Sequence, residues 1–235
     1  MACRGFSLAV LAVSAFCIGI FGAGSASAFT IHECRIGSGT GTEYTNGECS
    51  TVGSGGFQWV PLSAGVFTAV EPENASTMKM SSTFGGVKFA VQCTGTTGSG
   101  LFGNKPTAIG LEIALTYSGC SVVEPAGKGC SVPASMTTVP LRMEAPAMNV
   151  VYEPEAGSKF VMIEVSGCSI SGLNGKKEVT GSASAVVSAN GTKQEFTTTS
   201  GSELTVGAAP VSILESLGGR TRPMSGGQTI GYFTP

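Results

Sequence analysis

Few residues in this sequence could do acid–base chemistry. His32 is the only histidine, aspartate is absent, and all 15 acidic residues are glutamates. These counts exclude a Ser-His-Asp triad, an Asp-rich calcium loop and a multi-histidine metal centre. A catalytic histidine needs a partner and a walled pocket. Because His32 lies beside Glu33 and Cys34 near the start of the predicted mature chain, we expect it to be a surface residue.

Glutamates are the remaining candidates for catalysis. A glycosidase uses two carboxyl groups in one cleft, roughly 5 to 9 Å apart. Close pairs occur in the segments 71–73 and 153–155, and Glu112 and Glu164 fall in predicted strands. Prolines inside the two segments indicate solvated loops, so we predict that the protein has no catalytic residues. An extracellular glutamate-dependent glycoside hydrolase is the alternative.

Three aromatic residues near the start of the mature chain could bind a sugar. Tyr44, Phe57 and Trp59 lie within 16 residues of one another, and Trp59 is the only tryptophan. Aromatic rings could form a platform on which the apolar face of a sugar ring stacks. The alternative is that they only fill a small core beside a disulfide, where aromatic area dominates burial.

A glycine motif resembles a nucleotide-binding loop. The segment 98–103 reads G-S-G-L-F-G, which matches G-x-G-x-x-G. That loop works only between a strand and a helix whose N-terminus meets the phosphates. Pro106 and a strand pattern follow here instead, so we predict a flexible turn and no cofactor.

Charge and composition exclude other classes of protein. Only 12% of the residues are charged, and the formal net charge is −2. Nucleic-acid binding needs a concentrated basic surface, so no nucleic-acid partner is expected.

The first 28 residues have the pattern of a secretory signal peptide. Arg4 supplies a positive charge, the segment 6–22 is almost wholly apolar, and Ala26 and Ala28 form an A-x-A cleavage pattern. We therefore predict a mature chain that begins at Phe29. It would be secreted or held at the cell surface, with no transmembrane segment after cleavage.

Six cysteines remain after that cleavage, and we predict three disulfides. An even number of cysteines in an exported chain is typical of a disulfide framework. No C-x-x-C motif is present, and one histidine cannot complete a zinc site, so no metal is expected. Six cysteines allow 15 pairings. The favoured pairs, chosen because two of them close short loops over glycine-rich turns, are Cys34–Cys49, Cys120–Cys130 and Cys93–Cys168.

Alternating apolar and polar residues predict strands. This period of two is clear in the segments 87–93, 109–117, 139–143 and 179–189, where one buried and one wet face are expected. The Asn190-Gly191 pair predicts a tight hairpin. We expect ten or eleven strands, with one helical turn possible in the segment 210–217. The predicted fold is all-β, an antiparallel β-sandwich or flattened barrel closed by disulfides.

The mature chain divides by composition into two segments. Residues 29–62 form a small Gly-rich entry segment closed by a disulfide, and residues 63–235 form the main β domain. The segment 229–233 is a possible last edge strand.

Several framework motifs occur together in the mature chain. They are Tyr44-Thr45-Asn46-Gly47-Glu48-Cys49, the aromatic pair at Trp59, Gly119-Cys120 with Cys130, Ser166-Gly167-Cys168, and the segment 181–187 with Asn190-Gly191. In these motifs the sequence resembles a family of uncharacterised secreted, cysteine-containing β-rich proteins of soil actinobacteria. The resemblance implies export and a β-rich architecture, and it supplies no site residue.

The sequence therefore predicts a non-catalytic β protein of the cell envelope or extracellular matrix, with a structural or binding role. Its weakly charged, Ser/Thr/Gly-rich surface suits contact with envelope or matrix glycans, or self-association through an unpaired strand edge.

Overall fold

A computed structural model describes residues 29–37, 41–74, 76–105, 107–146, 149–197, 201–221 and 229–233. The predicted signal peptide lies outside these residues. The described chain is antiparallel β structure with one 3₁₀ turn, η1 (Ser171–Leu173), so the predicted all-β fold is confirmed. Within the same residues, no helix has the length and apolar character needed to span a membrane.

The described residues form eighteen strands, more than the ten or eleven predicted. Their bounds are β1 (Thr30–Ile36), β2 (Phe57–Pro61), β3 (Phe67–Asn74), β4 (Met78–Phe84), β5 (Val87–Cys93), β6 (Gly95–Asn104), β7 (Ala108–Ser118), β8 (Ser121–Glu124), β9 (Ser135–Thr137), β10 (Leu141–Glu144), β11 (Asn149–Pro154), β12 (Lys159–Val165), β13 (Gly175–Thr180), β14 (Ala183–Val187), β15 (Gln194–Phe196), β16 (Thr205–Val206), β17 (Ala209–Thr221) and β18 (Ile230–Phe233).

Eight strands close into a ring. The order is β17-β15-β14-β11-β10-β7-β6-β3, and β3 pairs back with β17. Every strand of the ring contributes buried apolar side chains to one core, and closure leaves the ring no open edge. Buried examples, one from each strand, are Val70, Phe102, Leu115, Met143, Tyr152, Ala185, Phe196 and Leu217.

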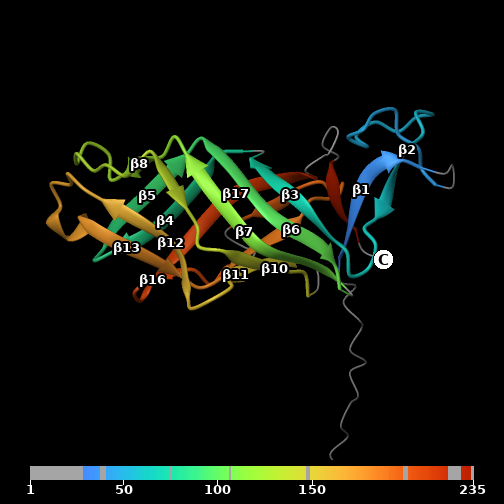
Figure 1. Ribbon diagram of the computed structural model, residues 1–235. Coiled ribbons are helices and arrows are strands. Elements are labelled where there is room, and N and C mark those ends of the chain that lie inside the picture. The colour runs from blue at the N-terminus through green and yellow to red at the C-terminus, as the bar shows by residue number, and fades with distance from the viewer. Residues whose placement is uncertain are drawn as a thin grey trace, which may run out of the picture.

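The long strand β17 also joins the ring to a second group of strands. Its first residues pair with β16 on one side and β4 on the other, and its last residues pair with β15 and β3. β13 and β12 continue from β16, while β5 and β8 continue from β4. Figure 1 shows this second group at the end of the molecule opposite β1 and β2. The segment 210–217 therefore lies in β17, and the helical turn allowed there is wrong.

A separate three-stranded sheet has the order β18-β1-β2. It lies at the right of Figure 1, and it brings the last strand of the chain beside the first. The buried Asn104 side chain at the end of β6 joins this sheet to the ring. Its Oδ1 accepts from Ile31 N, and its Nδ2 donates to the carbonyls of Ile31 and Leu62. The orientation of the small sheet is thus fixed by three buried hydrogen bonds.

Glu112 interrupts the alternation predicted for β7. Its φ of 53° and the shift in pairing opposite Ser99–Leu101 mark a bulge. Such a bulge adds one residue and reverses the faces. Ile113, Leu115 and Tyr117 are consequently buried, whereas Ile109 is on the other face with partial exposure. The backbone N–H of Glu112 donates to Glu155 Oε1 at 2.6 Å, which holds the bulge from the connection between β11 and β12.

The glycines of the segment 98–103 lie within β6, so the predicted flexible turn is wrong. They permit close packing of neighbouring backbone segments. A Cβ on Gly98 would lie 2.8 Å from the Ala114 carbonyl oxygen, and a Cβ on Gly103 would lie 2.5 Å from the Val66 carbonyl oxygen. No helix follows them in the described chain, so the nucleotide-loop geometry is not present.

All six cysteines of the described residues form disulfides, but two of the three predicted pairings are wrong. Cys34–Cys49 is confirmed, and the other bonds are Cys93–Cys120 and Cys130–Cys168. Strand register explains the difference. Gln92 pairs with Ser121, which places the two flanking cysteines side by side, and the bridge Ser131↔Ser166 brings the third pair together. Proximity across strands decided these bonds rather than the shortest loop.

Candidate functional site

A hollow of about 550 Å³ lies between the small sheet and the β14–β15 hairpin. One side comes from the loop closed by Cys34–Cys49 and from β2, and the other from the hairpin and the end of β17. Its volume falls within the roughly 300–1,000 Å³ typical of small-molecule sites. The lining includes Tyr44, Glu48, Ser50, Trp59, Asn190, Thr192, Lys193 and Phe233.

Aromatic rings form the apolar part of this hollow. The Trp59 and Phe233 ring centroids are 5.1 Å apart, with their planes at 54°. Tyr44 joins them in the lining. Hydroxyl, amide and charged side chains surround these rings, so the hollow offers both stacking surfaces and hydrogen-bonding groups.

The disulfide Cys34–Cys49 positions the first two aromatic residues. Cys34 pairs with Trp59 across β1 and β2, and Cys49 ends the loop that carries Tyr44. The backbone N–H of Tyr44 also donates to the carbonyl of Phe57 at 2.8 Å, which ties the loop to β2. The loop therefore has a covalent and a hydrogen-bonded anchor.

The C-terminal strand supplies Phe233. β18 pairs with β1 so that Phe233 faces Thr30, whose Oγ1 donates to the Phe233 carbonyl at 3.2 Å. The hairpin packs below, because the Tyr232 N–H donates to the Gly191 carbonyl at 2.8 Å. Segments from four parts of the chain therefore meet at this hollow.

Glycine at position 231 leaves room for the two rings. A Cβ there would lie 2.5 Å from Phe233 Cε2 and 3.1 Å from Trp59 Cζ3. Gly231→Ala should therefore displace both rings, lower the free energy of unfolding by about 1 to 3 kcal/mol, and shift the fluorescence of Trp59. Gly218→Ala is the matched control, since Gly218 lines the hollow and its Cβ would meet no atom closer than 3.8 Å. An equal effect of the two substitutions would contradict this packing.

A second hollow of about 300 Å³ is lined by the same three rings and by residues on the His32 side of the small sheet. Tyr44, Trp59 and Phe233 line both hollows, and the second adds His32, Thr42 and Gln58. Trp59 also lines a third hollow of about 470 Å³, which is formed by residues of both β1 and β2. Trp59 is therefore common to all three.

His32 is half-buried in the wall of the second hollow, whereas the sequence predicts a surface residue. Its ring meets Phe233 edge-on, with centroids 5.0 Å apart and planes at 85°. Burial lowers the pKa of His32, and the smaller opposing effect is its hydrogen bond to the Thr30 carbonyl. The imidazole is consequently neutral at pH 7, and it supports Phe233 without adding charge.

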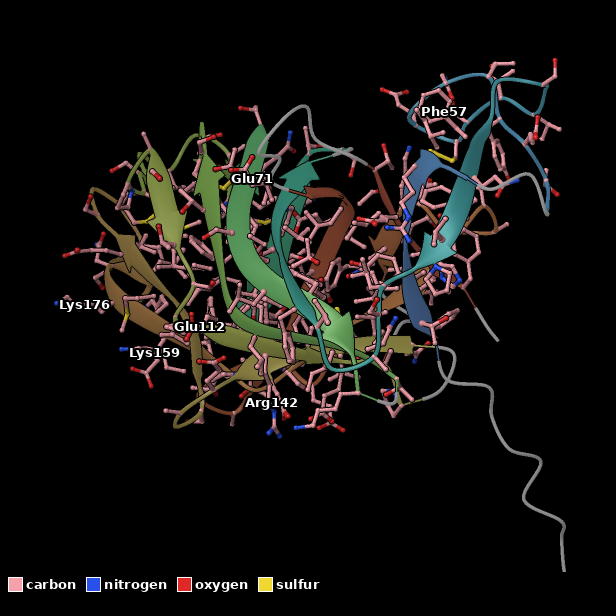
Figure 2. All side chains as sticks on the ribbon, turned by 45° about the vertical axis from the view of Figure 1, so that its right-hand side comes forward. Phe57, Glu71, Glu112, Arg142, Lys159 and Lys176 are labelled. Carbon is pink, nitrogen blue, oxygen red and sulfur yellow. A yellow bond between two sulfur atoms is a disulfide. The ribbon has the colours of Figure 1, made fainter. Side chains whose placement is uncertain are left out.

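The structure brings together two of the three predicted platform residues. Tyr44 and Trp59 line the same hollows, whereas Phe57 is not among the described residues that line them. The Phe57 ring lies instead over the turn at Gly47, and Figure 2 shows Phe57 at the outlying end of the small sheet, where β2 begins. Sequence reasoning missed Phe233 and the hairpin, although the last strand and the Asn190-Gly191 turn were both predicted.

The predicted glutamate candidates lie mainly on the outer surface of the main body. Glu153 accepts from Arg142 Nε at 2.6 Å, Glu155 caps the bulge at Glu112, and Glu164 is exposed. Figure 2 shows Glu71, Glu112 and Arg142 well separated from Phe57 at the outlying end of the small sheet. None of these glutamates is among the described residues that line the hollow between the small sheet and the hairpin.

Glu215 in β17 is a buried carboxyl group that sequence reasoning missed. Thr96 Oγ1 donates to its Oε1 at 2.6 Å, and the Tyr117 hydroxyl faces the carboxyl without meeting full hydrogen-bond geometry. Burial raises the pKa of Glu215 to about 7, against the smaller opposing effects of these two neighbours. Nearby, Tyr152 Oη donates to Gln194 Oε1 at 2.6 Å. The ring thus encloses a polar group inside an apolar core.

The chain matches no protein-family model, no curated protein and no solved structure. Only the chemistry of the site can therefore support a functional conclusion. The site is an aromatic groove with polar edges, and it consists of the two hollows that share Tyr44, Trp59 and Phe233. We call it the Trp59 groove.

Proposed function

We propose that this protein is a secreted or cell-surface glycan-binding module of the envelope or extracellular matrix, and that the Trp59 groove is its binding site. The observation that carries the proposal is the placement of Tyr44, Trp59 and Phe233 around a hollow with polar side chains at its edges. Three disulfides suit an oxidising compartment, which supports the extracellular location.

Sugar chemistry fits these groups. A sugar ring has apolar C–H faces and hydroxyl edges, so it needs aromatic surface together with amide, hydroxyl or charged side chains. Asn190, Thr192 and Lys193 provide such polar groups on the hairpin side, and Ser50 provides one on the loop side. Convergence of a few polar groups on an apolar hollow is typical of small-molecule sites.

Glycoside hydrolysis would need more than this groove supplies. The reaction uses two carboxyl groups, one on each side of the scissile bond. Of the described residues that line the hollow between the small sheet and the hairpin, Glu48 alone carries a carboxylate. Binding without hydrolysis is therefore the function that the groove supports best.

Trp59→Ala tests the proposal directly. Trp59 is the only tryptophan, so its fluorescence in the wild-type protein reports on ligands in the groove. We expect titration with a soluble glycan of a mixed panel (glucans, xylan, mannan and galactan) to shift or quench that emission. In isothermal calorimetry, Trp59→Ala should weaken binding by at least about tenfold, because one aromatic contact adds roughly 0.5–1.5 kcal/mol beyond its buried area.

Phe57→Ala is the matched aromatic control on the same strand. Its ring lies over Gly47 and outside the described lining of the groove, so binding should change by less than about twofold. Circular dichroism would verify that both variants fold. Equal losses in the two variants, or no binding of the wild-type protein to any glycan of the panel, would contradict the proposed function.

A further inference from the structure

The two hollows of the Trp59 groove share three aromatic lining residues. The hairpin side contributes about 550 Å³ and the His32 side about 300 Å³, with Tyr44, Trp59 and Phe233 in the lining of both. A ligand that stacks on these rings can therefore extend in both directions. A site for a chain end would need a closing wall on one side.

The ring planes limit the shape of the ligand. Trp59 and Phe233 are in contact at 5.1 Å, and their planes meet at 54°. A flat, rigid surface cannot lie against both rings. Two ring surfaces set at this angle can instead be contacted by successive sugar units of a single chain that bends over them.

The charges of the lining limit the ligand further. In the hollow between the small sheet and the hairpin, the described lining has one negative side chain, Glu48 on the loop, and one positive side chain, Lys193 on the hairpin, so their formal charges cancel. The His32 imidazole on the other side is neutral, because burial lowers its pKa. An uncharged chain is therefore favoured over a polyanion or a polycation.

We infer that the Trp59 groove binds an internal segment of one uncharged linear polysaccharide chain, rather than a chain end or a crystalline surface. This inference rests on the proposed function, and it specifies the form of the glycan. It predicts that affinity increases with chain length until both hollows are filled.

A length series tests the inference. Oligosaccharides of two to eight units would be prepared from whichever soluble uncharged polysaccharide of the panel the protein binds. Each would be titrated while Trp59 fluorescence is followed. The hexamer should bind at least about tenfold more tightly than the dimer, since each added ring contact is worth several-fold in Kd. Reduction of the hexamer's end sugar should change Kd by less than twofold.

Thr42→Arg identifies which hollow provides the gain. Thr42 is exposed at the His32 side, so an arginine there fills that hollow without disturbing the core. The hexamer should then bind no more tightly than the dimer. Thr51→Arg, an exposed change on the same loop outside the described lining, should keep the full length dependence.

The outcomes separate the two proposals. Dimer and hexamer of equal affinity, dependence on the end sugar, retention on crystalline cellulose or chitin, or a preference for an anionic polymer would overturn the inference and leave glycan binding intact. No response to any glycan would overturn the proposed function together with it.

Discussion

In a Glu215→Gln variant, the free energy of unfolding should stay nearly constant from about pH 5 to pH 8, whereas that of the wild-type protein should decrease over this range. In the wild-type protein, burial raises the pKa of Glu215 from 4.5 to about 7. Between these two values the native state holds a proton that the unfolded state has released. Stability therefore falls as pH rises through this window, because the native state binds more protons than the unfolded state.

The expected size of this effect is large for one side chain. A pKa difference of one unit corresponds to about 1.4 kcal/mol, so ionisation of Glu215 should cost the native state about 3 kcal/mol by pH 8. Glutamine resembles the protonated carboxyl group. Its oxygen can accept from the Thr96 hydroxyl, and its amide can donate towards the Tyr117 hydroxyl, which has no other partner among the described residues.

Chemical denaturation at several pH values measures the effect. At pH 5 the variant and the wild-type protein should have nearly equal free energies of unfolding, and at pH 8 the variant should be about 3 kcal/mol more stable. Glu195→Gln is the control, since Glu195 is exposed on the neighbouring strand β15 and carries the same chemical change. A wild-type pH dependence retained in Glu215→Gln would show that this carboxyl group is not the source.

The burial of Glu215 could have been predicted from the alternation of apolar residues in its strand. Val211, Ile213 and Leu217 are buried at alternate positions of β17, and Glu215 occupies the remaining position on that face. The allowance for a helical turn in the segment 210–217 concealed this alternation. The segment 87–93, in contrast, has regular alternation and coincides with β5.

Long-range pairing explains most of what the sequence could not reveal. The bulge at Glu112 depends on Glu155, and Phe233 reaches the groove only because β18 pairs with β1 about 200 residues away. Neither contact leaves a local pattern. Tyr44 and Trp59, by contrast, lie close in sequence to the disulfide Cys34–Cys49, so their meeting could be predicted from local spacing.

The two wrong disulfide pairings have the same origin. Loop length favoured Cys120–Cys130, which are ten residues apart, but the strand that follows Cys120 pairs with the strand that ends at Cys93. Register between distant strands is set by the buried faces of the whole sheet. A cysteine pattern gives the number of bonds more readily than their partners.

Removal of the Cys130–Cys168 disulfide should lower the stability of the protein without weakening glycan binding. Replacing Cys130 and Cys168 by alanine opens a loop with a sequence separation of 38, and should lower the free energy of unfolding by about 4 kcal/mol in the chain-entropy model. This bond joins the β8–β9 connection to the β12–β13 connection, and neither cysteine lines the described Trp59 groove. Glycan affinity at 25 °C should stay within about twofold, provided that the variant remains folded.

Replacing Cys34 and Cys49 by alanine should cause a smaller loss of stability but a larger loss of glycan affinity. The sequence separation is 15, so the expected loss of stability is about 3 kcal/mol. This bond holds the loop that carries Tyr44, and its release lets one wall of the groove move away from Trp59. We expect the affinity to fall at least about tenfold, because a mobile loop must be ordered again on binding.

The two double variants control for each other. Denaturation curves give the loss of stability, and calorimetry with the panel glycan gives the affinity of the folded fraction at matched temperature. A larger loss of affinity on opening Cys34–Cys49 than on opening Cys130–Cys168, despite the smaller loss of stability, would place the binding energy in the disulfide-closed loop. Equal losses of affinity would mean that the ring and its hairpin hold the glycan without that loop, and the assignment of Tyr44 to the site would then be wrong.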